Sequence, residues 1–169
     1  MEERTKKLIA SLHSGILNEN QFLKTYFNKT TLSDQFVIEL LKRGVSKKDS
    51  DLIEEAIVLL STNAFSIPTF VSKLSNLLLE KWHNKHEDIV TLLKEYHDSN
   101  TVDFLYKTAL LKLEYLEYDD TYQLARKCIK SLSGINNQES IERLKLLSDY
   151  KNTIIANYAK KELIQKGLL

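Results

Sequence analysis

The chain has 169 residues, 43% of them hydrophobic, and 24 Lys and Arg face 23 Asp and Glu. A length and composition of this kind are typical of one globular domain with a sizeable core. The net charge of +1 gives no overall field that would attract nucleic acid, and no apolar run approaches the roughly 20 residues that cross a bilayer.

The first segment, residues 1–17, is expected to be a helix that caps the N-terminal end of the fold. Its opening letters, MEERTKK, lack the apolar stretch of a secretory signal. The single cysteine, Cys128, cannot form an internal disulfide and lies at helical spacing with Ala125 and Leu132, so we expect it in the core. These features favour a cytoplasmic protein of bacterial type, a monomer when free, with no membrane contact and no cofactor.

Helical periodicity continues along the rest of the chain, which has one Pro and four Gly. Turns and β-hairpins depend on both residue types, and no useful segment alternates apolar and polar residues with period two. The sequence therefore predicts an all-α fold.

Several pairs of residues match the capping box, in which an N-cap side chain and the third helical residue satisfy each other's backbone N–H groups. These pairs are Asn18/Gln21, Asp51/Glu54, Asn84/Glu87, Asn100/Asp103, Asp120/Gln123 and Asn136/Glu139. Ser33, Ser66 and Asn152 fit as N-caps without the box.

Residues 81–88, KWHNKHED, hold the only Trp and two of the four His. We interpret them as a helix start in which Asn84 is the N-cap and Trp82 is a mostly buried hydrophobic staple. A zinc protease site needs His-Glu-x-x-His on one helix, whereas here the order is His-x-x-His-Glu-Asp across a helix boundary. His97 lies about three turns further along, too far to join His86 as a ligand. We predict no metal site.

Residues 113–122 read LEYLEYDDTY. They begin near the end of an acidic part of the chain, residues 86–120, which carries nine acids against three Lys. Acids between aromatic residues suit a protein interface, because Tyr offers a large contact area at low entropic cost and acids add specificity. The predicted partner-binding residues are Glu114, Tyr115, Glu117, Tyr118, Asp119 and Asp120. The alternative is a solvated turn in which Asp120 caps the next helix. No catalytic residue is expected, because adjacent Asp119 and Asp120 point apart and no nucleophile lies beside them.

The expected caps recur in four pairs that start at 18, 51, 84 and 120, followed by a single cap at 152, and the second member of each pair comes 15 or 16 positions after the first. Two helices in every 32 to 36 residues predict an α-solenoid, in which stacked units form the core together. We expect four to five antiparallel helix pairs in a single domain, residues 1–169. Three glycines, Gly44, Gly134 and Gly167, are expected as left-handed C-caps, and Gly15 as the end of the first helix.

The segment LARKCIKSLSGINNQESIERLKLL, residues 124–147, resembles a bacterial HEAT-like repeat. Residues that match its pattern are Ala125, Leu132, Gly134, Ile135, Glu139, Ile141, Leu144 and Leu147. YHDSNTVDFLYKTAL (96–110) resembles a second copy and YAKKEL (158–163) the start of another. The resemblance covers about residues 84–169, whereas residues 18–83 agree only in cap spacing. The Pro of eukaryotic HEAT units is missing, which favours the bacterial subtype.

This resemblance implies a fold rather than a reaction. HEAT-like arrays mostly bind macromolecules along their second helices, and small bacterial examples include immunity proteins of polymorphic or contact-dependent toxin systems. We therefore expect a non-enzymatic protein-binding module, with a toxin that has a basic surface as its partner. The alternatives are a general scaffold or adaptor, and a nucleic-acid-processing enzyme such as an alkylpurine DNA glycosylase, for which Trp82 with Asp88 or Asp120 is the candidate set. Nearly balanced charges on the expected second helices make nucleic acid the weaker alternative.

Overall fold

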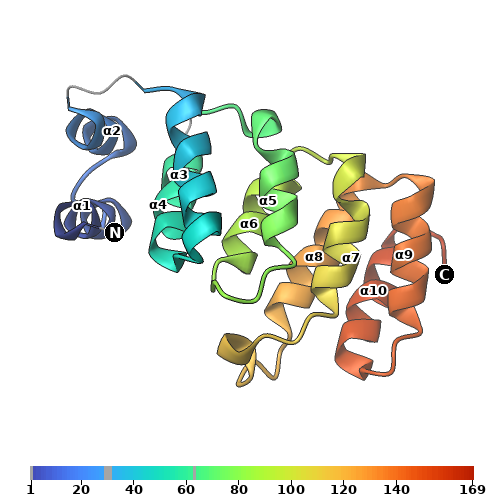
Figure 1. Ribbon diagram of the computed structural model, residues 1–169. Helices are drawn as coiled ribbons and strands as arrows, with labels where there is room; N and C mark the ends of the chain where they lie inside the picture. Colours follow the sequence, from blue (N-terminus) through green and yellow to red (C-terminus); the bar gives the residue numbers. More distant parts are fainter. Residues whose placement is uncertain (1, 29–31, 63) are drawn as a thin grey trace. The chain divides into compact units, whose positions relative to one another are not determined.

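The computed structural model describes residues 2–28, 32–62 and 64–169. Within these ranges the chain forms ten α-helices and three short 3-10 helices, with no β-strand (Figure 1). The all-α prediction is confirmed for this part of the sequence. The chain divides into two compact units, Met1–Thr69 and Phe70–Leu169.

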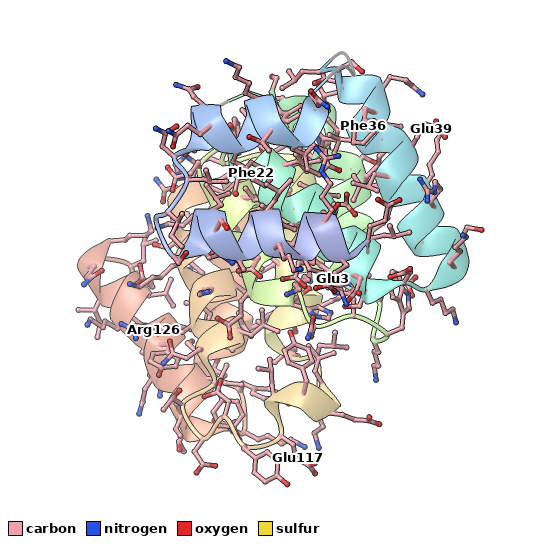
Figure 2. The ribbon with its side chains drawn as sticks, turned by 90° about the vertical axis from the view of Figure 1, so that its left-hand side faces the viewer. Glu3, Phe22, Phe36, Glu39, Glu117 and Arg126 are labelled. Carbon is pink, nitrogen blue, oxygen red and sulfur yellow. The ribbon has the colours of Figure 1, made fainter. Side chains whose placement is uncertain are left out.

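The first unit contains four α-helices and one 3-10 helix: α1 (Glu3–His13), α2 (Glu19–Phe27), α3 (Asp34–Lys47), α4 (Ser50–Leu60) and η1 (Ile67–Thr69). α3 packs most extensively on α4, and α1 contacts both α2 and α4. Phe22 of α2 is fully buried, and Figure 2 shows it on the side of α2 that faces α1. The phenol of Tyr26, also on α2, donates a hydrogen bond of 2.5 Å to the carboxylate of Glu55, which is buried on α4.

The second unit contains six α-helices and two 3-10 helices: α5 (Val71–Leu77), α6 (His86–Lys94), η2 (Ser99–Thr101), α7 (Val102–Ala109), η3 (Glu114–Leu116), α8 (Gln123–Ile135), α9 (Gln138–Ser148) and α10 (Thr153–Gln165). The most extensive contacts join α7 to α8 and α9 to α10. Contacts also run from α6 to α8 to α10 and from α5 to α7 to α9. These two series form two layers of helices (Figure 1), and the core between them includes Leu74, Ile89, Leu105, Ile129 and Leu144.

Three of the expected N-caps are confirmed. Asn18 forms the full capping box with Gln21, Ser33 accepts from the backbone of Phe36, and Asn152 accepts from the first turn of α10. These side chains satisfy N–H groups that have no partner inside the helix.

The other expected caps are displaced along the chain. Asp49, rather than Asp51, accepts at the start of α4, while Asp51 pairs with Lys6 at 3.2 Å. Asn136 adopts a left-handed conformation that ends α8, so Asn137 becomes the N-cap of α9. α6 starts one residue later than expected, and 3-10 turns precede α5 and α7, which therefore begin at Val71 and Val102.

Two of the four glycine predictions are wrong. Gly15 and Gly167 have the positive φ of helix ends, as expected. Gly44 and Gly134 instead lie inside α3 and α8, and a Cβ at either position would come within 2.6 Å of a neighbouring side chain. Gly44 permits close packing of α3 on α4, and Gly134 permits the close approach of the His97 side chain from the turn after α6. The left-handed C-caps are formed by the residues Lys48 and Asn136.

Candidate functional site

The segment that joins α7 to α8 carries the acidic and tyrosine residues singled out above. It extends beyond the ends of both helices and contains η3 (Figure 1). Leu113 is buried and anchors the segment to the core. Glu117 lies at the outer edge of the segment (Figure 2).

A pocket of about 390 Å³ opens between this segment and the adjoining ends of α7 and α8. Its apolar lining is supplied by Ala109, Leu111, Leu113, Leu116, Leu124 and Ala125, with Thr108 and Tyr122 beside them. Its charged lining consists of Glu114, Glu117, Asp119, Asp120 and a single cation, Lys112. The pocket therefore combines an apolar floor with a rim of four acids against one base.

The geometry of η3 separates the predicted acids from the predicted tyrosines. The backbone N–H of Glu117 bonds to the carbonyl of Glu114, and in such a three-residue turn Glu117 lies on the same side as Glu114 and Tyr115 lies on another. Both glutamates line the pocket, whereas neither tyrosine does. The side chain of Tyr118 is 94% exposed.

Asp119 and Asp120, adjacent in the sequence, have different roles. One carboxylate oxygen of Asp119 accepts hydrogen bonds from the backbone N–H and the hydroxyl of Thr121. The other oxygen accepts a hydrogen bond of 2.7 Å from the backbone N–H of Gln123, which is the first residue of α8. These bonds, led by the Thr121 hydroxyl, hold the pKa of Asp119 below its usual range. Asp119 therefore fulfils the capping role expected of Asp120, whose exposed carboxylate lies on the pocket rim.

Two buried histidines, His83 and His86, lie next to each other, and His86 contacts Tyr115 of the acidic segment. His83 and His86 are stacked with ring centroids 4.3 Å apart. Nδ1 of His83 accepts from the backbone N–H of Lys85, so its Nε2 carries the proton and donates to the carbonyl of Leu77 at 2.8 Å. Nε2 of His86 donates to the carbonyl of Glu80 at 2.8 Å, which leaves Nδ1 to accept from the phenol of Tyr115 at 3.0 Å. The bond from the Lys85 N–H assigns a neutral form to the His83 ring, and the neutral form of the His86 ring follows from its burial.

The surroundings of the histidine pair disfavour a charge on either ring. Burial lowers the pKa of His83, and burial together with the proximity of His83 lowers the pKa of His86 to about 4. Burial also raises the pKa of Tyr115 to about 12, so the phenol keeps its proton. The contact between His86 and Tyr115 is consequently one between two neutral groups at physiological pH.

Trp82 is neither fully buried nor exposed, which agrees with its expected burial, whereas its role as a hydrophobic staple stays a prediction. Its Nε1–H donates to the carboxylate of Glu80 at 2.8 Å, and its ring meets His83 edge-on at 5.1 Å. The polar edge of an indole commonly keeps such a partner near water. The Trp82 ring therefore lies against His83.

The ring nitrogens of His83 and His86 are all engaged in hydrogen bonds within the chain, which leaves none of them to bind a metal ion. In the described ranges no three His, Cys, Asp or Glu side chains come together as a possible metal site. Cys128 is fully buried, as expected, and burial raises its thiol pKa far above the usual value. A buried, protonated thiol is a poor nucleophile.

The link between the histidine pair and Tyr115, 29 residues away from His86 in the sequence, was missed by sequence reasoning. A signal for the burial of His86 was present. His86, Ile89, Val90 and Leu93 have the spacing i, i+3, i+4, i+7, which places the histidine on the apolar face of α6. No sequence pattern indicated Tyr115 as its partner.

Comparison of the chain with protein-family models, with curated proteins and with solved structures finds no match. Among the residues described by the structure, no helix has both the length and the apolar character needed to cross a membrane.

Proposed function

We propose that this chain is a non-enzymatic protein-binding module and that its acidic pocket receives a cationic side chain of a protein partner. The observation that supports this proposal is the apolar floor beside the acidic rim, built around Leu113, Glu114, Glu117 and Asp120. Arg and Lys have long apolar stems and charged ends, so they match both parts of such a pocket. Exposed Tyr118 beside the pocket adds contact area suited to an interface.

The class of partner that we propose is a bacterial toxin domain with a basic surface, and the chain would act as its immunity protein. This follows from the HEAT-like resemblance of residues 84–169. It is supported by the consecutive packing of α6, α8 and α10 and of α5, α7 and α9, which suits an α-solenoid. A toxin nuclease has a basic cleft because its substrate is a polyanion, and an acidic projecting segment could occupy that cleft.

The test is to isolate the partner by affinity capture from the native host and to measure its binding to charge-reversed variants. We choose Glu117→Lys with Asp120→Lys, because both residues line the pocket and are exposed. Asp119 is left unchanged since it caps α8. We expect roughly tenfold weaker binding with a smaller salt dependence, because rim charges act through screened attraction.

The matched control is Glu95→Lys with Asp149→Lys. These acids are also exposed, lie at the C-caps of α6 and α9, and change the net charge by the same amount. The control should bind as tightly as the wild type. Equal affinities for all three proteins would remove the acidic pocket from the interface, and specific salt-sensitive binding to duplex DNA would favour the nucleic-acid alternative.

A further inference from the structure

A second cavity, of about 180 Å³, lies between α8 and α10 and shares no lining residue with the acidic pocket. α8 contributes Arg126 and Lys130, one helical turn apart, and α10 contributes Lys161 opposite them. The remaining polar residues of the lining are Tyr158, Glu162 and Gln165. The cavity thus brings together three cations, one carboxylate and two neutral hydrogen-bonding groups.

The three cations of this cavity are not neutralised by ion pairs. Throughout the described ranges, no carboxylate lies within 4.0 Å of the charged nitrogens of Arg126, Lys130 or Lys161. Lys127, the neighbour of Arg126, is by contrast paired with Glu87 at 2.7 Å. Unpaired cations gathered around one cavity leave a local positive field available to a ligand.

Arg126 is held in place before any ligand arrives. Its guanidinium lies over the ring of Tyr158 at 5.7 Å, a cation–π arrangement. The hydroxyl of Tyr158 in turn donates to the carbonyl of Thr121 at 2.8 Å, just before α8 begins. Arg126 lies at the surface of the unit (Figure 2), so an incoming anion can reach it from solvent. A pre-positioned guanidinium reduces the entropic cost of binding an oxyanion.

We propose that the cavity between α8 and α10 binds a phosphate dianion, either inorganic phosphate or the phosphoryl group of a small monoester. Three cations and one carboxylate leave two net positive charges, which match the charge of about −1.5 to −2 that a phosphoryl monoester carries at pH 7. The cavity is smaller than the 300–1,000 Å³ typical of drug-sized ligands, so a phosphoryl group fits it better than a whole nucleotide. Arg126 supplies the planar fork that recognises phosphate oxygens, and the lysines add point charges.

The proposal is tested by titrating the full chain with inorganic phosphate at constant ionic strength while recording amide chemical shifts by NMR. We expect saturable shifts confined to residues 126–130 and 158–165. Lys161→Ala should weaken binding about fivefold or more, because a charge-assisted hydrogen bond is lost at a partly solvated site. Glu162→Gln should strengthen binding severalfold, since it removes the only opposing carboxylate of the cavity.

The matched control is Lys160→Ala, which removes an equally charged, exposed lysine from α10 that does not line the cavity. Its affinity for phosphate should equal that of the wild type, and all variants should keep the wild-type helical circular dichroism. Equal losses in Lys160→Ala and Lys161→Ala, or shifts that do not saturate, would overturn the site. Acetate that binds as tightly as phosphate would overturn the assignment to a dianion.

Discussion

Nδ1 of His86 accepts a hydrogen bond of 3.0 Å from the phenol of Tyr115, and this bond fastens the start of α6 to η3. The rings also stack with centroids 5.7 Å apart. Tyr115 lies next to Glu114, which lines the acidic pocket. The position of the pocket rim is therefore coupled to a histidine that must remain neutral to accept this bond.

Replacing Tyr115 by Phe should lower the free energy of unfolding by about 1 kcal/mol. The variant leaves Nδ1 of buried His86 without its partner, and an unsatisfied buried acceptor has a cost of this order. Urea denaturation measures the change. Tyr118→Phe removes the same atom from a side chain that is 94% exposed, so it should match the wild type. Equal effects of the two substitutions would show that the His86 contact adds no stability.

Acid should destabilise the fold between pH 6.5 and about 4. His86 has a pKa of about 4 in the folded chain, lowered mainly by burial and then by His83, from an ordinary value of 6.5. The unfolded chain therefore binds more protons in this range, so the stability is fully present above pH 6.5 and is lost as pH falls towards 4. We expect a loss of about 2 kcal/mol after allowance for solvent screening.

Melting curves across this pH range measure the loss. The groups that face His86 are neutral His83, the phenol of Tyr115 and the carbonyl of Glu80. Among the described residues, therefore, no carboxylate is bonded to the ring to compensate its charge. His86→Gln should flatten the pH dependence, whereas His13→Gln, at an exposed position, should preserve it. A wild-type slope in the His86 variant would assign the acid sensitivity to other groups.

The same substitution should have opposite effects at the two glycines inside helices. Gly→Ala gains up to about 1 kcal/mol in a helix interior. A Cβ at Gly44 would meet Cδ1 of fully buried Ile53 at 2.6 Å, and overpacking of this kind costs about 1–3 kcal/mol. A Cβ at Gly134 would meet the ring of His97, which is exposed and can rotate away. We expect Gly44→Ala to destabilise and Gly134→Ala to be neutral or stabilising in thermal melts.

Tyr26→Phe should destabilise the first unit by about 2 kcal/mol, because it deprives the buried carboxylate of Glu55 of a donor at 2.5 Å. Burial and the bond to Glu55 raise the pKa of Tyr26, so the phenol is the donor at all ordinary pH values. Hydrogen exchange of amides in α2 and α4 measures the loss locally. The Tyr26→Phe, Glu55→Gln double variant should recover part of the lost stability, because the side chain at position 55 that lacks its donor is then uncharged. If the double variant lost as much stability as the two single variants together, the coupling between Tyr26 and Glu55 would be refuted.

Local chemistry made much of the fold predictable. Asn18, Ser33 and Asn152 cap helices because an N-cap depends on one side chain and the next three backbone groups. The same local logic left open whether residues 113–122 form an interface or a solvated turn. The predicted position of an N-cap was wrong by one or two residues where two side chains can both accept, as at the start of α4, where Asp49 rather than Asp51 is the cap.

The features that sequence reasoning missed depend on contacts between distant residues. Gly44 matched a C-cap pattern, but its role is set by Ile53 on the next helix. His86 matched a helix start, but its protonation state is set by Tyr115 and by burial. The choice of Asp119 rather than Asp120 as the cap of α8 is by contrast local, because Asp119 bonds to Thr121 and Gln123.

Trp82 makes the second unit optically distinguishable from the first. It is the only Trp of the chain, and Met1–Thr69 contains none, so tryptophan emission follows residues 70–169 alone. Its ring touches His83 edge-on, and a protonated imidazole quenches indole more strongly than a neutral one, so the emission is expected to dim as the histidine pair takes up a proton. Circular dichroism at 222 nm records the helices of both units. Emission and dichroism transitions that coincide during unfolding would identify the two units as one cooperative system, and separate midpoints would give each its own stability.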